Sequence, residues 1–169
     1  MANYDIDIRE TSEQDLDNVM CLWNNGDVMF FVGFPEGLGI TAERLKKWLA
    51  WAIKKPGRCH YSIYADEFDY CGEAFYDSTG EHGIASLDIK LLPNAQGKGI
   101  AKTALIFVID KAFKVGGAQR VYVDPSPENT KAWVLYNKVG FVSRPRPSHL
   151  KEGDTYLEIT ADEWALLNK

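Results

Sequence analysis

The pattern of apolar and polar residues along the chain predicts a mixed order of strands and helices. Apolar and polar residues alternate, as in half-buried strands, in five segments: 6–10, 61–65, 70–76, 84–91 and 119–123. Apolar residues recur at helical spacing in four others, which lie within residues 12–24, 41–54, 100–115 and 129–139. A final hairpin is predicted within 141–159, and a capping box of Thr160 and Glu163 begins a last short helix. With no internal repeat or linker, we expect one α/β domain over residues 1–169, with a mixed, mostly antiparallel sheet flanked by helices.

Residues 25–40 do not fit this pattern. In this segment Met29, Phe30, Phe31, Val32 and Phe34 lie among four glycines and a proline. Two interpretations are open: a mobile flap over a pocket, or a connector that packs in the interior.

Composition narrows the classes of function. A chain of 169 residues that is 46% hydrophobic can bury a sizeable core. The net charge of −5 argues against a general polyanion-binding role, so nucleic acid is not an expected partner. Three cysteines, Cys21, Cys59 and Cys71, have no metal-ligand spacing, and we interpret them as reduced thiols. We see neither a signal peptide nor a membrane-spanning stretch, and expect a cytoplasmic protein with no membrane partner.

The turn at 93–101 is the most informative segment for chemistry. It contains Gly97 and Gly99 and joins the strand 84–91 to the helix that begins at residue 100. Such a turn directs free N–H groups and the positive end of a helix toward one point, which suits an anion, most often a phosphate. The turn lacks the GxxxxGK[ST] spacing, and Lys102 stands where GxGxxG requires a third glycine. Taken alone, it could also be an ordinary loop.

Two motifs in order resemble one family. Residues 96–101 resemble the Q/R-x-x-G-x-G/A signature of the GNAT superfamily of acyl-CoA-dependent N-acetyltransferases, with Ala101 in place of the commoner glycine. Downstream, a strand is followed by Asn129, by Tyr136 seven residues later and by a Gly-Phe pair, which is similar to the family's second hallmark. The resemblance is close over 85–143. It implies a single-domain GNAT-type fold, acetyl-CoA as acyl-donor cosubstrate and no metal.

The same resemblance implies roles for individual residues in binding acetyl-CoA. The backbone of Ile89 and Leu91 would bind the pantetheine amides, and one of their N–H groups would polarise the thioester carbonyl. The pyrophosphate would be held by the backbone of the turn, which comprises Gln96, Gly97, Lys98, Gly99, Ile100 and Ala101. Asn129 would orient the pantetheine arm or a water, and as a helix N-cap it has a purely structural alternative.

Acetyl transfer to an amine also calls for a proton donor and benefits from a base. Tyr136 is the expected donor to the leaving thiolate, since a phenol has a reference pKa of about 10. Without the motif it would be interpreted as a core tyrosine. Asp124 is the expected base, and Glu73 and Asp88 are alternatives; each could instead be a solvated strand carboxylate, and a water chain could replace a dedicated base. The three histidines, His60, His82 and His149, show no pairing pattern.

The acceptor is predicted only as a class. Residues 8–25 resemble the group that acetylates ribosomal-protein N-termini, whereas 124–129 resemble some aminoglycoside 6′-N-acetyltransferases. We therefore expect direct attack, in a ternary complex, by the primary amine of a small molecule or of a peptide N-terminus, with an aminoglycoside as the alternative. A non-catalytic acyl-CoA-binding domain and a plain nucleotide-binding α/β protein are hypotheses of other classes. The oligomeric state is left open, with a homodimer as one option.

Overall fold

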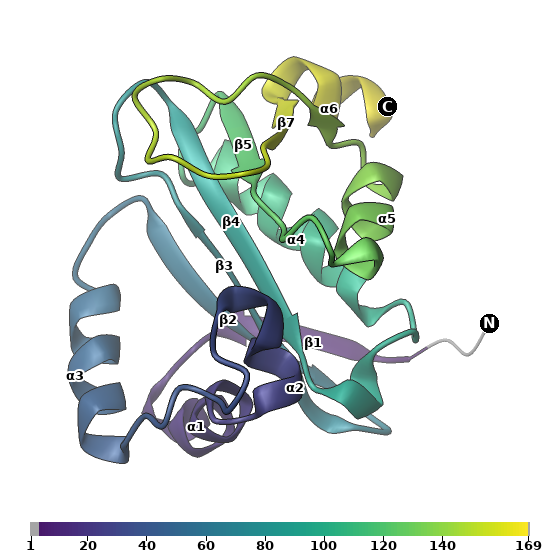
Figure 1. The fold of residues 1–169 in the computed structure, drawn as a ribbon. Helices are drawn as coiled ribbons and strands as arrows, with labels where there is room; N and C mark the ends of the chain where they lie inside the picture. Colours follow the sequence, from purple (N-terminus) through teal and green to yellow (C-terminus); the bar gives the residue numbers. More distant parts are fainter. Residues whose placement is uncertain (1–3, 169) are drawn as a thin grey trace.

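The computed structural model describes residues 4–168, which form one seven-stranded sheet (Figure 1). In sheet order the strands are β1 (Ile6–Glu10), β2 (Arg58–Ala65), β3 (Asp69–Asp77), β4 (Ile84–Leu91), β5 (Arg120–Val123), β7 (Leu157–Thr160) and β6 (Val142–Ser143). The β4–β5 pair is parallel, and the other pairs are antiparallel. The predicted mixed, mostly antiparallel sheet is therefore confirmed.

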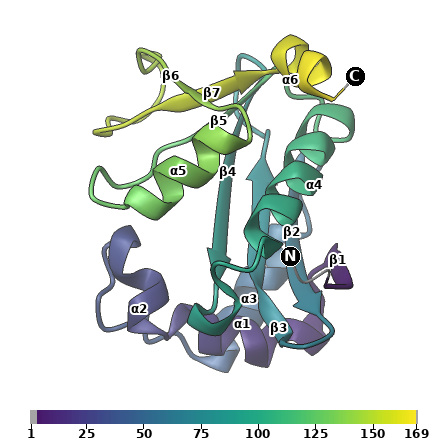
Figure 2. The same cartoon turned by 90° about the vertical axis from the view of Figure 1, so that its right-hand side faces the viewer.

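Helices cover both faces of the sheet. They are α1 (Leu16–Trp23), α2 (Gly26–Met29), α3 (Ala42–Ala52), α4 (Ile100–Lys114), α5 (Thr130–Lys138) and α6 (Ala161–Leu167), with short 3-10 turns η1 (Glu13–Asp15), η2 (Phe30–Val32) and η3 (Pro93–Ala95). Figure 2 shows α4 on one side of the strands and α2 on the other. Apart from η1, α2, η2 and η3, these elements match the predicted ones to within a few residues.

The face of the sheet under α4 is apolar. Ile100, Leu105, Val108 and Ile109 of α4 are fully buried, at the spacing that brings one side of a helix onto a sheet. Each such side chain contributes roughly 1.5–3 kcal/mol through burial. A smaller cluster joins α1 to α3 on the opposite face, with Tyr70 of β3.

The opposite face carries polar side chains, because successive residues of a strand point to opposite sides. We call this the polar face and define it by His60, Ser62, Glu73, Asp88, Lys90 and Tyr122. The helices α1, α2 and α3 and the loop 144–156 lie on this side in Figure 1.

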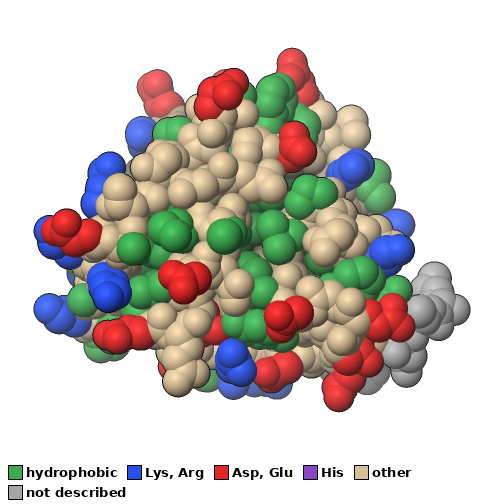
Figure 3. Space-filling model, turned by 90° about the horizontal axis from the view of Figure 1, so that it is seen from below, with side chains coloured by type: hydrophobic (Ala, Val, Ile, Leu, Met, Phe, Trp, Pro, Cys, Tyr) green, Lys and Arg blue, Asp and Glu red, His purple; other side chains and the backbone are tan. Residues whose placement is uncertain are grey.

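Residues 25–40 fold into α2, η2 and a closing loop. The side chain of Asn24 joins the two ends, because it donates to the Ile40 carbonyl at 3.0 Å and accepts from the Ile40 N–H at 2.7 Å. The large apolar side chains at the tip, however, are exposed: Phe30, Phe31, Val32 and Phe34. Apolar side chains are visible across the face of the molecule drawn in Figure 3. The interpretation of this segment as a buried connector is therefore wrong, whereas its mobility stays a prediction.

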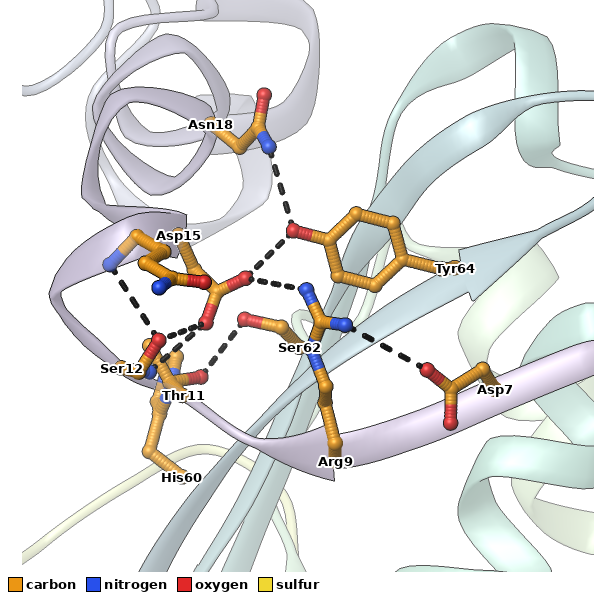
Figure 4. Close-up of polar contacts among 10 residues, drawn as sticks. Asp7, Arg9, Thr11, Ser12, Asp15, Asn18, His60, Ser62 and Tyr64 are labelled. Atoms are coloured by element: carbon orange, nitrogen blue, oxygen red, sulfur yellow. Dashed lines mark hydrogen bonds and ion pairs between the residues drawn. The ribbon is translucent and has the colours of Figure 1, made fainter.

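The start of α1 is anchored to the sheet through Asp15 (Figure 4). This fully buried carboxylate accepts hydrogen bonds from the Tyr64 hydroxyl at 2.5 Å and from the Ser12 N–H at 2.8 Å, and Arg9 forms an ion pair with it at 3.2 Å. Burial alone would raise the pKa of Asp15, but the hydrogen bonds from Tyr64, Ser12 and Arg9 hold it below its ordinary value. Asp15, which lies within residues 8–25, thus anchors the start of the first helix to the sheet.

Strands β4 and β5 are paired over only part of their length. The parallel pairing joins Ile84–Ser86 to Arg120–Tyr122, but β4 continues to Leu91. The edge of β4 beyond Ser86 is therefore left open by β5. On its other side β4 lies very close to β3, because a Cβ added at Gly72 would come within 2.0 Å of the Lys90 carbonyl oxygen. The absence of a side chain at Gly72 thus allows the end of β4 to approach β3 this closely.

Candidate active site

The open edge of β4 presents the N–H groups of Ile89 and Leu91. The N–H of Leu92 donates to the carbonyl of Cys71 on β3 at 2.8 Å, and the register between the two strands is regular. In an antiparallel pair, alternate residues direct their N–H groups to opposite edges. The N–H groups of Ile89 and Leu91 therefore point away from β3, toward the side where β5 separates. This is the geometry expected for pantetheine binding, which itself stays a prediction.

The turn 93–101 follows directly and has the predicted strand–turn–helix form. Gly97 and Gly99 have φ angles of +73° and +84°, in the left-handed region that favours glycine. The Gln96 side chain donates to the Leu91 carbonyl at 3.1 Å, which ties the turn to the end of β4. Ile100 is buried and fixes the first residue of α4, whereas Lys98 is exposed.

Tyr136 lies on α5 with its ring buried against Phe141, at a centroid distance of 5.6 Å. Burial raises the pKa of the Tyr136 hydroxyl, and the negative charges of Asp88 and Asp124 raise it further. The hydroxyl is therefore protonated at neutral pH. Asn129 caps α5, because its Oδ1 accepts from the Ala132 N–H at 3.2 Å.

Asp124 follows β5 and forms an ion pair that the sequence did not predict. Its carboxylate is half exposed and lies 3.1 Å from Nη2 of Arg146. Arg146 also donates to the carbonyls of Lys151 and Thr155, at 2.7 and 2.9 Å. The loop 144–156 is thus organised around the guanidinium that pairs with Asp124.

Asp88 and Lys90 project from β4 onto the polar face. One oxygen of Asp88 accepts from the Ile89 N–H at 2.8 Å, and the other forms an ion pair with Lys90. Lys90 also lies 3.5 Å from Glu73 on β3. Burial alone would lower the pKa of Lys90, but the charges of Asp88 and Glu73 raise it above its ordinary value. Lys90 is therefore a cation shared by two carboxylates.

Glu73 is buried, so its interpretation as a solvated strand carboxylate is wrong. Its oxygens accept from Nε1 of Trp23 at 2.8 Å, and Nε2 of His60 lies 2.9 Å away. Burial alone would raise the pKa of Glu73, but the charges of His60 and Lys90 and the hydrogen bonds of His60 and Trp23 lower it to about 2. A carboxylate held ionised in this way is a weak base, which argues against Glu73 as the one that deprotonates an amine.

The histidines also form pairs that the sequence pattern did not reveal. His60 contacts Glu73 and, through Nδ1, the hydroxyl of Thr11 at 2.7 Å. The rings of His82 and His149 lie 4.2 Å apart and line a cavity of about 410 Å³. Ser86 and Tyr122, the last paired residues of β4 and β5, line the same cavity. The cavity therefore begins where the two strands separate.

Three further features of the structure concern metal-ligand groups, membrane-spanning helices and the state of the cysteines. Within residues 4–168 there is no group of three or more His, Cys, Asp or Glu side chains that could hold a metal ion. In the same part of the chain, no helix is both long enough and apolar enough to cross a membrane. Cys21, Cys59 and Cys71 are free thiols.

Comparisons with known proteins agree on one family. A sequence model described as the acetyltransferase (GNAT) domain matches residues 5–142. Spermidine N(1)-acetyltransferase of Vibrio cholerae serotype O1 is 35% identical over 71 residues, which cover 42% of this chain and only 39% of that protein.

Solved structures share the fold. The spermidine N-acetyltransferase from Vibrio cholerae in complex with CoA and spermine superposes with a TM-score of 0.80 at 20% identity, over 95% of this chain and 98% of that one. A GNAT-family acetyltransferase from Streptococcus pneumoniae gives a TM-score of 0.74 at 19% identity, over 92% and 99% of the two chains. The predicted fold class and the acyltransferase class are thus confirmed: the chain belongs to the GNAT family of acetyltransferases.

Proposed function

We propose that this protein transfers the acetyl group of acetyl-CoA to a primary amine of a polyamine such as spermidine, by direct attack in a ternary complex. The observation that carries this proposal is the separation of β4 from β5 beyond the Ser86–Tyr122 pair, because Asp88 and Asp124 each lie two residues past that pair, one on each strand's continuation. A polyamine is favoured by the local similarity to a spermidine N(1)-acetyltransferase. Carboxylates on the side from which an amine would enter suit a polycation.

The donor would be held by backbone groups. The first N–H groups of a helix have no partner within the helix, and together with the helix dipole they attract a pyrophosphate. Residues 96–101 supply such a helix start in α4. The N–H groups of Ile89 and Leu91, which face the open edge of β4, would bind the pantetheine arm and polarise the thioester carbonyl. The hydrogen bond from the Gln96 side chain to the Leu91 carbonyl would hold the turn 96–101 in a fixed position relative to the end of β4.

The chemical step needs a neutral amine and a protonated leaving group. The amine nitrogen would form a bond to the carbonyl carbon, and the carbon–sulfur bond would break. Tyr136 would give its proton to the departing thiolate, and the proton that the acylated nitrogen then loses would return to Tyr136 through solvent. The Tyr136 hydroxyl carries its proton at neutral pH, because the ordinary pKa of a phenol is about 10 and burial raises it further. The same shift makes Tyr136 a weaker acid, so the proton would move only once negative charge has developed on the sulfur.

Two carboxylates could receive the proton that the ammonium loses before attack. Asp124 is half exposed and shares its charge with Arg146, so an acceptor would bind it in competition with that guanidinium. Asp88 lies on β4, the strand next to β5, and forms an ion pair with Lys90. We propose that Asp124 binds the ammonium and accepts its proton, either directly or through a water.

A thiol-release assay with acetyl-CoA tests the acceptor. The panel contains spermidine, spermine, a peptide with a free N-terminus and an aminoglycoside. We expect release with the polyamines, a rate that rises with pH as the amine loses its proton, and a higher acceptor KM in Asp124→Asn. Release only with the peptide would favour an N-terminal acetyltransferase, and release only with the aminoglycoside a 6′-N-acetyltransferase. Tight acetyl-CoA binding with no release for any amine would favour a non-catalytic acyl-CoA-binding domain.

A further inference from the structure

One N–H group of the candidate site has two potential acceptors. The N–H of Ile89 faces the open edge of β4, where the thioester carbonyl of the donor is proposed to bind. In this structure the same N–H donates to Oδ1 of Asp88 at 2.8 Å. A single N–H cannot make two strong, well-aligned hydrogen bonds, so the carboxylate and the carbonyl would compete for it.

Asp88 is held on the polar face by a second contact. Its other oxygen pairs with Lys90, which is itself held by Glu73, and Glu73 is fixed by Trp23 and His60. The chain of contacts is largely buried, and the Lys90 side chain is only 12% exposed. If Asp88 leaves the Ile89 N–H, this ion pair therefore keeps its carboxylate next to the site instead of releasing it to solvent.

We propose that Asp88 is a positioning residue that couples the two substrates. The acetyl carbonyl displaces Asp88 from the Ile89 N–H, and the displaced carboxylate then faces the acceptor ammonium. Binding of acetyl-CoA would thus precede and favour binding of the amine. This inference rests on the proposed function. In it, the Asp88 side chain lowers the affinity for acetyl-CoA and raises the affinity for the acceptor amine.

The test compares two ligands that differ only in the acetyl group. Titration calorimetry measures the affinities of acetyl-CoA and of CoA, which lacks the competing carbonyl, for wild type and Asp88→Ala. We expect the ratio of acetyl-CoA to CoA affinity to rise roughly tenfold in Asp88→Ala, the size of one hydrogen bond to a charged group. The KM for spermidine should rise in the same variant. Asp88→Asn, which keeps an acceptor atom without the charge, should show a smaller change in the same direction.

Glu81→Gln serves as the matched control, because Glu81 is an exposed carboxylate in the β3–β4 turn. The ratio of acetyl-CoA to CoA affinity in this variant should equal that of wild type. If Asp88 only supports β4, Asp88→Ala and Asp88→Asn will each bind acetyl-CoA and CoA more weakly by the same factor. An unchanged ratio would therefore overturn the inference while leaving the proposed function standing. Failure of wild type to bind either ligand would instead overturn the proposed function, and this inference with it.

Discussion

The indole nitrogen of Trp23 lies 2.8 Å from both carboxylate oxygens of Glu73. A residue at the end of α1 is thereby bonded to the middle of β3, beneath the helices that cover the polar face. The same carboxylate contacts His60 and Lys90, so one side chain joins α1, β2, β3 and β4. Glu73 is therefore expected to stabilise the fold and to fix Lys90 beside the candidate site.

Replacing Glu73 with glutamine should destabilise the protein by about 3 kcal/mol or more at neutral pH, because a buried charge loses its partner. The pKa of Glu73 is lowered from its ordinary 4.5 to about 2 in the folded chain. Its stabilising effect is thus fully present above pH 4.5 and is lost as the pH falls toward 2. Urea denaturation between pH 2 and 7 should show a larger loss of stability in wild type than in Glu73→Gln, which keeps the contribution of Asp15, a carboxylate whose pKa is also lowered. Glu67→Gln, at an exposed position of the β2–β3 turn, should behave as wild type.

Alanine substitutions at two glycines distinguish an effect on acetyl-CoA binding from an effect of backbone strain alone. Gly99 and Gly117 have positive φ angles of +84° and +67°, and at both an added Cβ would meet no atom within 4 Å. Alanine at either position should therefore cost a similar free energy of unfolding, about 1–2 kcal/mol. We expect only Gly99→Ala to weaken acetyl-CoA binding, by several-fold in calorimetry. Equal acetyl-CoA affinities in the two variants would remove residues 96–101 as the pyrophosphate site.

A third substitution concerns the hydroxyl of Tyr70. This oxygen is buried, and within the described residues it has no hydrogen-bond partner. An unsatisfied buried polar group costs about 1–3 kcal/mol. Tyr70→Phe should therefore leave the free energy of unfolding unchanged or raise it by about 1 kcal/mol, as measured by urea denaturation. A clear loss of stability would mean that the hydroxyl has a partner in solution.

Local signals in the sequence predicted most of the fold and the strand–turn–helix form of residues 84–114. Strand alternation and helical spacing predicted the main elements, and the second motif predicted the helix that carries Tyr136, whose catalytic role stays a prediction. The register with β3 directs the N–H groups of Ile89 and Leu91 to the open edge of β4, whereas their binding of pantetheine stays a prediction.

The acceptor side could not be predicted, because its contacts join distant parts of the chain. Glu73 meets His60 only through the register of β2 with β3, and Trp23 reaches it only once α1 is placed. Alternation marks Glu73 as lying on one face of its strand but does not reveal that helices cover that face. The pairing of Asp124 with Arg146 depends on a loop without periodicity, for which the sequence offers no rule.

The central claim is that Tyr136 donates the proton in acetyl transfer to a polyamine. The most direct measurement is the rate of N-acetylspermidine formation from acetyl-CoA and spermidine, followed by mass spectrometry, for wild type, Tyr136→Phe and the buried control Tyr70→Phe. We predict that kcat falls roughly tenfold or more in Tyr136→Phe with acetyl-CoA affinity nearly unchanged, and that Tyr70→Phe keeps the wild-type rate. A Tyr136→Phe variant that forms N-acetylspermidine at the wild-type rate, with only its stability reduced, would contradict the account.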